Sequence, residues 1–388
     1  MRSSALDLTS AEVASARLGI SRASLYAYVS RGLIRSFTSP HDPRQRLYAL
    51  DDVEALVERK ARFRRPAAAA ATALDWGLPV LETRITQIKD GRLFYRGADA
   101  LTLAETAGIE AVACLLVGGM EAEAFDAPSP PTGSPESPAL GPRAYVARAI
   151  RLLSEHGEET GHTACDVVSI LRLMVMAGSG SHPRARPFHR HLAGAWNAEE
   201  AGEAIRRALV LCADHELSAS AFAVRVAAST GATLGNAVIA GLAALSGPLH
   251  GGATERVRAL LEDHEAEGGV ERLAARLEAS EEIPGFHHPL YPDGDPRGAA
   301  IVEGLPLLAC DAAALSAIAE AGAGHASVDV GLVAMERAFR LPRGAAFALF
   351  ASGRSAGWLA HAVEQRSQGS LIRPRARYVV AEEAPHEP

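Results

Sequence analysis

Apolar positions recur at helical spacing through most of the chain. From residue 143 onward, stretches with apolar side chains three or four positions apart alternate with short breaks of Gly, Pro and Ser, a pattern typical of successive amphipathic helices. Residues 80–97 differ, because apolar and polar side chains alternate on either side of Asp90-Gly91, a dipeptide favoured in hairpin turns. We therefore expect a mainly helical protein in which this short β-hairpin is the only appreciable strand region.

The first 66 residues predict a separate small module. Residues 8–34 predict two helices joined by a tight turn, in which Gly19 ends the first helix and Ser21 caps the second. A Pro-rich wing follows, and a further helix is expected from Asp51. The apolar pattern assigns the small core to Val13, Ala14, Leu18, Leu25 and Val29.

Charge distinguishes this module from the rest of the chain. Residues 1–66 carry twelve basic and seven acidic side chains, a net charge of +5, whereas the remainder carries 27 basic and 39 acidic side chains, a net charge of −12. Such a basic segment favours a nucleic-acid partner. The residues that we expect to face DNA are Arg22 and Tyr26 on the second helix and Arg44 and Arg46 in the wing.

The stretches LYAYVSRGLI, RLY and DDVEAL, in that order, resemble MerR-type winged helix-turn-helix domains. The resemblance covers about the first 60 residues and implies duplex DNA as a partner. The alternative interpretation is a helical protein-protein module whose arginines form a solvated face.

Length and composition place the chain among globular proteins. A chain of 388 residues with 48% hydrophobic, 22% charged and 5% aromatic residues fits two or three domains rich in helix. The four cysteines are far apart and form no C-x-x-C pair, which favours neither a disulfide framework nor a zinc ribbon. No signal peptide or membrane span is expected, so the sequence predicts a cytoplasmic protein without a membrane partner.

Polar clusters that interrupt the helical body carry its candidate chemistry. Arginine binds carboxylates in a forked geometry, and histidine and aspartate transfer protons, so these clusters suggest a carboxylate-rich substrate. There is no phosphate-binding loop of the G-x-x-x-x-G-K-[ST] type in the sequence. The clusters read DHELSAS (214–220), GPLHGGATE (247–255), GFHHPLYPDGDPR (285–297), SVDVGLVA (327–334), GRSAGWLAHAVEQ (353–365) and LIRPRARY (371–378).

In spelling and order these clusters resemble the citrate synthase family over about residues 78–378. The resemblance implies an acyltransferase that condenses acetyl-CoA or a short acyl-CoA with oxaloacetate, giving citrate or methylcitrate and CoA. It implies a homodimer and no metal or other cofactor. It also implies the following division after the linker 67–77: a helical large domain, 78–251 and 341–388, and a helical small domain, 252–340.

The resemblance implies a role for each matching side chain. His250 matches the histidine that hydrogen-bonds the thioester carbonyl, Asp329 the base that removes the methyl proton, and His288 the histidine that polarises the ketone of oxaloacetate. His250 also precedes a helix, whose N-terminus disfavours the imidazolium form. The implied ligands of the oxaloacetate and citrate carboxylates are His215, Arg297, Arg354 and Arg373, the last supplied across a dimer interface.

Several positions depart from the family pattern. Ser218, Thr254 and Ser327 stand where family members often have asparagine, and Pro289 and Pro292 where basic residues are common near the CoA phosphates. The choice between acetyl-CoA and propionyl-CoA therefore stays open. So do two alternatives to an enzyme: a transcription regulator whose citrate-synthase-like body senses a metabolite, and a structural body that dimerises the helix-turn-helix.

Overall fold

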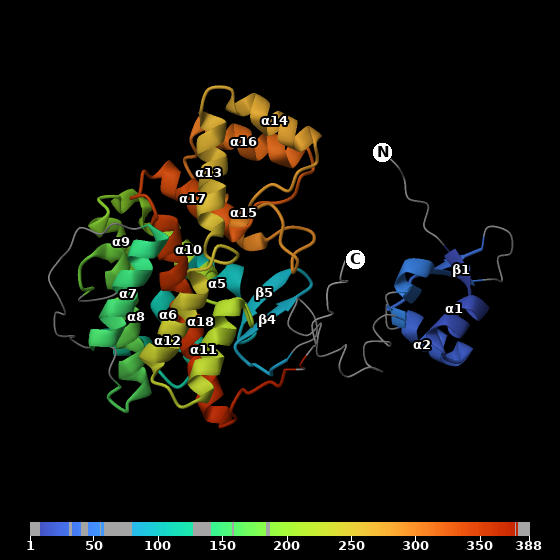
Figure 1. Cartoon of the computed structure of the whole chain (residues 1–388), viewed down its shortest axis with the longest axis horizontal. Coiled ribbons are helices and arrows are strands. Elements are labelled where there is room, and N and C mark those ends of the chain that lie inside the picture. Colours follow the sequence, from blue (N-terminus) through green and yellow to red (C-terminus); the bar gives the residue numbers. More distant parts are fainter. Residues whose placement is uncertain are drawn as a thin grey trace, which may run out of the picture. The chain divides into compact units, whose positions relative to one another are not determined.

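The computed structural model describes residues 8–30, 33–39, 46–54, 56–57, 80–126, 141–156, 159–183, 187–376 and 378. The chain divides into two compact units, Met1–Glu82 and Thr83–Pro388 (Figure 1). The predicted linker 67–77 and the wing residue Arg44 lie outside the described residues. Within the described part, no helix has both the length and the apolar character needed to cross a membrane.

The smaller unit contains a helix-turn-helix and a three-stranded sheet. Residues 50–54 are helical after the sheet, as expected from Asp51. The strand order is β1-β3-β2, with antiparallel pairing throughout. Its elements are β1 (Leu8–Ser10), α1 (Ala11–Leu18), α2 (Arg22–Ser30), β2 (Ser36–Thr38) and β3 (Arg46–Ala49).

Local signals in this unit are confirmed in part. Gly19 ends α1 with a φ of 60°, a conformation that suits glycine, and Ser21 Oγ accepts a hydrogen bond from the Ser24 amide at 3.2 Å. The assignment of Val13 to the core is wrong, because α1 buries its face at Ala14 and Leu18 and leaves Val13 43% exposed. The expectation of a single strand region is also wrong, since backbone pairing of short segments around the wing forms a second sheet.

The larger unit is mostly helical, as predicted. A small sheet of order β4-β5-β6 leads into it, with a hairpin turn at Asp90-Gly91 as expected. Its elements are β4 (Thr86–Lys89), β5 (Arg92–Tyr95), β6 (Ala98–Asp99), α5 (Ala100–Thr106), α6 (Ile109–Val117), the 3₁₀ helix η1 (Ala122–Asp126), α7 (Pro142–His156), α8 (Thr163–Ser179), α9 (Phe188–Ala195), the 3₁₀ helix η2 (Glu199–Ala201), α10 (Gly202–Leu211), α11 (Ala219–Ser229), α12 (Leu234–Leu245), α13 (Ala253–Glu265), α14 (Gly269–Glu278), α15 (Pro296–Val302), α16 (Ala309–Glu320), α17 (Val328–Ala338) and α18 (Ala345–Gln368).

Helix α18 is the central element of this unit. It packs against α6, α8, α10, α11 and α12, and Figure 1 shows it among them. Almost every residue from Ala345 to Ala362 is buried, so the helix has no solvent-facing stripe over that length. Small residues along it allow neighbouring backbones to approach closely.

A second group of helices lies at one end of the unit. Helix α13 packs against α14, α16 and α17, and Figure 1 shows α14 and α16 together beside α13, away from α11 and α12. These helices fall within residues 252–340. The division of the body into a large and a small domain stays a prediction.

The close packing of α12 against α11 and α18 at Gly241 can be tested by substitution. A Cβ added at Gly241 lies 2.7 Å from Val224 Cγ2 and 3.0 Å from Trp358 Cδ2, so Gly241→Ala forces buried side chains apart. We expect a loss of about 1–3 kcal/mol in the free energy of unfolding, as for overpacked cores, measured by chemical denaturation.

Gly194→Ala is the matched control for this prediction. Gly194 lies in α9 with no atom within 4 Å of an added Cβ, and alanine favours helix by up to about 1 kcal/mol over glycine. Equal stability of the wild type and Gly241→Ala would contradict the packing described for this site.

Candidate active site

The polar clusters come from separate elements of the larger unit. His215 lies in the turn between α10 and α11, and His250 in the turn that precedes α13. His288 lies in the loop before α15, Arg297 in the first turn of α15. The remaining two predicted residues are Asp329, in the first turn of α17, and Arg354, within α18.

The structure brings these six residues together: ring contacts link five of them in two groups, and electrostatic interactions with Arg297 and Arg354 link Asp329 to both groups. The ring centroids of His215 and His288 are 5.0 Å apart, and Tyr291 joins them through a 3.0 Å hydrogen bond to His215 Nε2. The Arg297 guanidinium lies 5.5 Å from the centroid of the Tyr291 ring. Phe350 makes a similar link, with the Arg354 guanidinium 4.7 Å and the His250 ring 6.2 Å from its centroid.

All three histidines have a pKa below the ordinary range. Burial and the neighbouring Arg354 lower the pKa of His250 to about 4. Burial and Arg297 lower the pKa of His288 to about 4. The pKa of His215 is lowered well below its usual value by burial, with Arg297 and Arg354 next in effect. Each ring is therefore neutral at pH 7, able to donate one hydrogen bond and accept another.

A hydrogen-bond chain orients His250. The Trp358 indole N–H, which can only donate, donates to Ser220 Oγ at 3.2 Å, and Ser220 Oγ lies 2.8 Å from His250 Nε2. Ser220 Oγ also lies 3.2 Å from Ser218 Oγ, so its single proton can be donated to either His250 Nε2 or Ser218. Where it is donated to Nε2, the proton of the neutral imidazole is on Nδ1.

The backbone sets the tautomer of His288. The Leu290 amide donates to His288 Nδ1 at 3.2 Å, so Nδ1 accepts and the neutral ring carries its proton on Nε2. The loop 285–291 thus presents an N–H donor from His288.

Two buried arginines supply positive charge to the site. Arg297 Nε and Nη2 donate to the carboxylate of Asp295 at 2.9 and 2.8 Å, and both side chains are almost fully buried. Burial acts to lower the pKa of Arg297, but the adjacent Asp295 raises it overall. Arg354 Nε donates to the Cys212 carbonyl at 2.9 Å, and burial lowers the Arg354 pKa. A planar guanidinium held at Nε directs its other N–H groups toward a carboxylate ligand.

Asp329 lies at the N-terminus of α17 and is half-buried. Burial raises the pKa of its carboxyl to about 6; Asp295 adds to this rise, whereas Arg297, Arg256 and Arg354 oppose it. A carboxylate with a pKa near neutrality is suited to accept and return a proton.

The other predicted site residues lie elsewhere. Arg373 is exposed in the segment after α18, and among the described residues it makes no hydrogen bond or ion pair with the cluster. In the smaller unit, Arg22 is exposed beside Glu12 at 3.9 Å, and Tyr26 is 56% exposed on the same helix. Arg46 is exposed on β3, where it donates to Ser36 and Thr38.

Three substituted positions have local roles. Ser218 caps α11 by accepting from the Ala221 amide at 3.3 Å, and Thr254 donates to the Gly251 carbonyl at 3.2 Å. Ser327 Oγ is buried and has no hydrogen-bond partner in the described part of the chain. Pro289 and Pro292 are exposed.

Sequence reasoning missed several residues of the cluster. Tyr291 and Asp295 lie inside the segment GFHHPLYPDGDPR, so that segment contained the signal for both. Ser220 is the last residue of the segment DHELSAS and follows Ser218, one of the three substituted positions, by two residues. Phe350 precedes its cluster by three positions and has no local signal.

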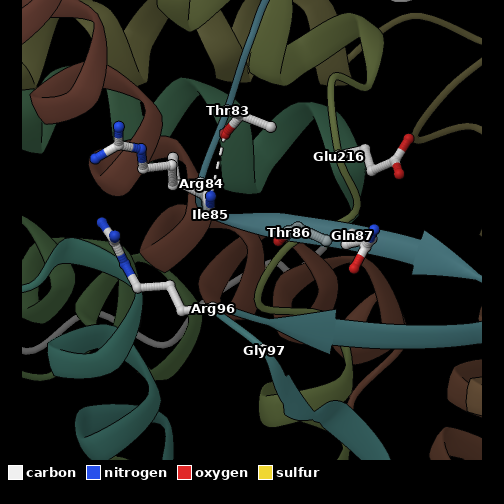
Figure 2. A pocket seen from close by; sticks show the side chains of 8 residues that line it. All are labelled: Thr83, Arg84, Ile85, Thr86, Gln87, Arg96, Gly97 and Glu216. Carbon is white, nitrogen blue, oxygen red and sulfur yellow. Dashed lines mark hydrogen bonds between the residues drawn. The ribbon is translucent and has the colours of Figure 1, made fainter.

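A separate polar cleft of about 630 Å³ lies along β4, next to Glu216 (Figure 2). None of the six clustered residues lines it. Figure 2 shows Arg84 and Arg96 near the Ile85 end of β4 and Glu216 further along the strand, near Gln87. No group of three or more His, Cys, Asp or Glu side chains placed to hold a metal occurs among the described residues. The lining residues are Thr83, Arg84, Ile85, Thr86, Gln87, Arg96, Gly97 and Glu216.

Comparison with known families gives two matches. The family described as "Citrate synthase, C-terminal domain" matches residues 145–375, and the family described as "Helix-turn-helix domain" matches residues 8–61.

Curated relatives have related names. The "Putative citrate synthase 2" of Mycobacterium tuberculosis is 38% identical over 190 residues, which is 46% of this chain and 51% of that protein. The "2-methylcitrate synthase" of Shewanella oneidensis is 36% identical over 182 residues, 44% of this chain and 48% of that protein. The chain thus spans about half the length of the curated relatives that it matches.

Solved structures match over more of the chain. Citrate synthase from Thermotoga maritima has 25% sequence identity and a TM-score of 0.60, covering 80% of this chain and 96% of that one. Citrate synthase from Thermoplasma acidophilum, solved as a ternary complex with carboxymethyl coenzyme A and oxaloacetate, covers the same shares with a TM-score of 0.60. At 23% identity, the second match concerns the fold alone. The predicted fold class is confirmed.

The raised pKa of Asp329 predicts a pH-dependent stability. A carboxyl whose pKa is about 6 in the folded chain and 3.8 unfolded binds its proton more tightly when folded, so its ionisation destabilises the fold. We expect Asp329→Asn to raise the free energy of unfolding by about 1–3 kcal/mol at pH 8. The gain should shrink between pH 6 and 4 and vanish below that range, as measured by urea denaturation across pH.

Asp293→Asn is the control, because Asp293 is an exposed carboxyl in the loop before α15. As a substitution of an exposed side chain, it should change the free energy of unfolding by less than about 0.5 kcal/mol. A gain for Asp329→Asn that does not depend on pH would contradict the assignment of a raised pKa to this carboxyl.

Proposed function

The chain belongs to the citrate synthase family, and from this premise we propose that it condenses acetyl-CoA, or a short acyl-CoA, with oxaloacetate to give citrate, or methylcitrate, and CoA. The observation that carries the proposal is the convergence of three neutral histidines and two buried arginines with a carboxylate whose pKa is about 6. No metal or other cofactor has a role in it.

In the first step Asp329 removes a proton from the carbon next to the thioester carbonyl. That proton is weakly acidic, so the base succeeds only if the oxygen of the forming enol is stabilised at the same time. His250 provides this stabilisation by donating from Nδ1. Ser220 supports the role, because a hydrogen bond donated by its hydroxyl to Nε2 leaves the ring proton on Nδ1.

In the second step the enol carbon attacks the ketone carbon of oxaloacetate. His288 polarises the ketone by donating from Nε2, and the charge that develops on the ketone oxygen is stabilised there. Arg297, Arg354 and His215 hold the carboxylates of oxaloacetate and of the product. The ketone oxygen takes up a proton as the carbon–carbon bond forms, equivalent to the one that Asp329 removed. Water then cleaves the thioester: its oxygen bonds to the carbonyl carbon, the carbon–sulfur bond breaks, and a proton passes to the thiolate, which leaves as CoA.

We expect Asp329→Asn to lower turnover on the order of a thousandfold or more, because the amide keeps the shape of the side chain but cannot take the proton. The measurement is CoA release from acetyl-CoA and from propionyl-CoA, each with and without oxaloacetate. The two acyl-CoAs also settle substrate choice.

Asp263→Asn is the control for this variant, since Asp263 is an exposed carboxylate on α13 that pairs with Arg272. It should keep wild-type turnover. A tenth of wild-type activity in Asp329→Asn would rule out its role as the base, and no dependence of CoA release on oxaloacetate in the wild type would rule out the reaction.

We propose that the active form is a homodimer in which Arg373 reaches the site of the other subunit. The exposed position of Arg373 outside the cluster of its own chain supports this arrangement. The same base variant tests it: mixing Asp329→Asn with Arg373→Ala subunits should restore activity in hybrid dimers. An active monomer, or exchange without recovery, would contradict it.

A second function, duplex DNA binding through residues 1–66, is supported by the helix-turn-helix match and by the net charge of +5. Arg22 and Tyr26 are exposed on α2, the helix after the turn, and Arg46 is exposed on the neighbouring sheet. We propose that Arg22 and Tyr26 contact base edges and that Arg46 contacts a phosphate.

We expect DNA affinity to fall steeply with salt, because neutralised phosphates release counterions. Arg46→Ala should flatten the log–log slope by about one unit, and Arg22→Ala should abolish selection of an inverted repeat from genomic fragments. Arg17→Ala is the matched control, since the Arg17 guanidinium is held by Glu54 at 2.6 Å. Retention of random DNA that is equal at every salt concentration would contradict the proposal.

A further inference from the structure

A fully buried pair of an aspartate and a histidine adjoins the cluster. Asp214 Oδ1 and His361 Nε2 are 3.3 Å apart, and both side chains have no exposed surface. Asp214 precedes His215 in the chain, and His361 lies in α18, seven residues beyond Arg354. The reaction proposed above uses neither residue.

The turn that carries Asp214 packs against Gly353, Gly357 and His361, which lie four residues apart on one face of α18. A Cβ at Gly353 would lie 2.6 Å from the Leu209 carbonyl oxygen. A Cβ at Gly357 would lie 2.2 Å from Asp214 Oδ1. His361 is the next of these three residues, so the two glycines bring the turn close enough for Asp214 to reach it.

Other contacts hold the same turn from its far side. The Tyr95 hydroxyl, buried in β5, lies 3.0 Å from the Val210 carbonyl oxygen and 3.3 Å from that of Asp214. The Ile88 amide donates to Glu216 Oε1 at 2.9 Å, and Figure 2 shows Glu216 beside β4. His215 thus has a fixed residue on each side in sequence.

Burying the Asp214 carboxylate costs free energy, so close packing alone does not account for its presence here. Among the described residues, neither Asp214 carboxylate oxygen makes a hydrogen bond of ordinary geometry. His361 is the main group that compensates the charge of Asp214, and Arg354 and Thr86 contribute less. Burial acts to raise the pKa of Asp214, yet His361 lowers it overall and keeps the carboxylate charged. Buried ion pairs add little stability compared with apolar side chains of the same volume. What this pair adds is a fixed orientation.

We propose that Asp214 and His361 are positioning residues, which hold the backbone at His215 so that its ring meets the carboxylate of oxaloacetate together with Tyr291. This inference rests on the proposed function. It concerns binding of oxaloacetate and leaves the acyl-CoA side of the site untouched.

The test uses Asp214→Asn, His361→Gln and the double variant of the full chain. Misplacement of a binding group by about 1 Å costs up to about a hundredfold, so each single variant should raise KM for oxaloacetate about tenfold or more. KM for the acyl-CoA should change less than about twofold. In the double variant two amides can hydrogen-bond without charge, so part of the loss in KM for oxaloacetate should be recovered.

Asp311→Asn is the matched control. Asp311 is an equally buried carboxylate, paired with Arg337 at 2.8 Å between α16 and α17. Its loss should lower the melting temperature and leave both KM values unchanged. A loss of folded protein alone lowers the measured kcat and does not alter KM, so the KM for oxaloacetate separates positioning from support of the fold.

Thermal stabilisation by oxaloacetate gives a second readout that needs no turnover. If the wild type releases CoA and is stabilised by oxaloacetate, but the Asp214 and His361 variants keep both KM values, this inference alone is overturned. Wild type that does neither would overturn the proposed function, and this inference with it. If Asp214→Asn fails to fold, His361→Gln decides the question by the same readouts.

Discussion

One buried carboxylate, that of Asp295, sets the geometry on which the cluster depends. It caps α15 by accepting from the Arg297 amide at 3.0 Å, and it binds the Arg297 guanidinium through both oxygens. Its Oδ2 also accepts from the Val328 amide at 3.1 Å, at the start of the helix that carries Asp329. Two helices and two charged side chains are thereby joined at one point, and Gly298 allows the close approach because a Cβ there would lie 2.1 Å from the Ala326 carbonyl oxygen.

Helix α18 provides the other fixed reference. A helix that is buried on all sides is typical of the core of a large protein. It carries Arg354 one residue after Gly353, so the close contact with α10 also brings the guanidinium to the Cys212 carbonyl. Trp358 on the same helix donates to Ser220 Oγ, which lies 2.8 Å from His250 Nε2. Side chains of α18 therefore hold Arg354 and the surroundings of His250. The loop around Asp295 holds Arg297 and the start of the helix that carries Asp329.

The sequence predicted the helical class, the Asp90-Gly91 hairpin and the segments that converge on the cluster. These signals are local, since apolar spacing, turn residues and short motifs can be read within a few positions. The contacts between segments could not be read in this way: Tyr291 with His215, Ser220 with His250 and Asp214 with His361 join residues 76, 30 and 147 positions apart. The burial of Val13 was predicted wrongly because a helix of only eight residues, α1, leaves the direction of its buried face to tertiary packing.

The charges of the cluster also bear on the order of events in the proposed reaction. Arg297 and Arg354 act to lower the pKa of Asp329, against the effect of burial. An oxaloacetate dianion bound between these two arginines would cancel much of their field at Asp329 and bring negative charge nearer, and both effects raise the pKa of the carboxyl. Because proton transfer becomes easier as the base strengthens, a site already filled with the dicarboxylate would abstract the thioester α-proton better than an empty one. The same two arginines would thus bind the first substrate and, once neutralised by it, strengthen the base that activates the second.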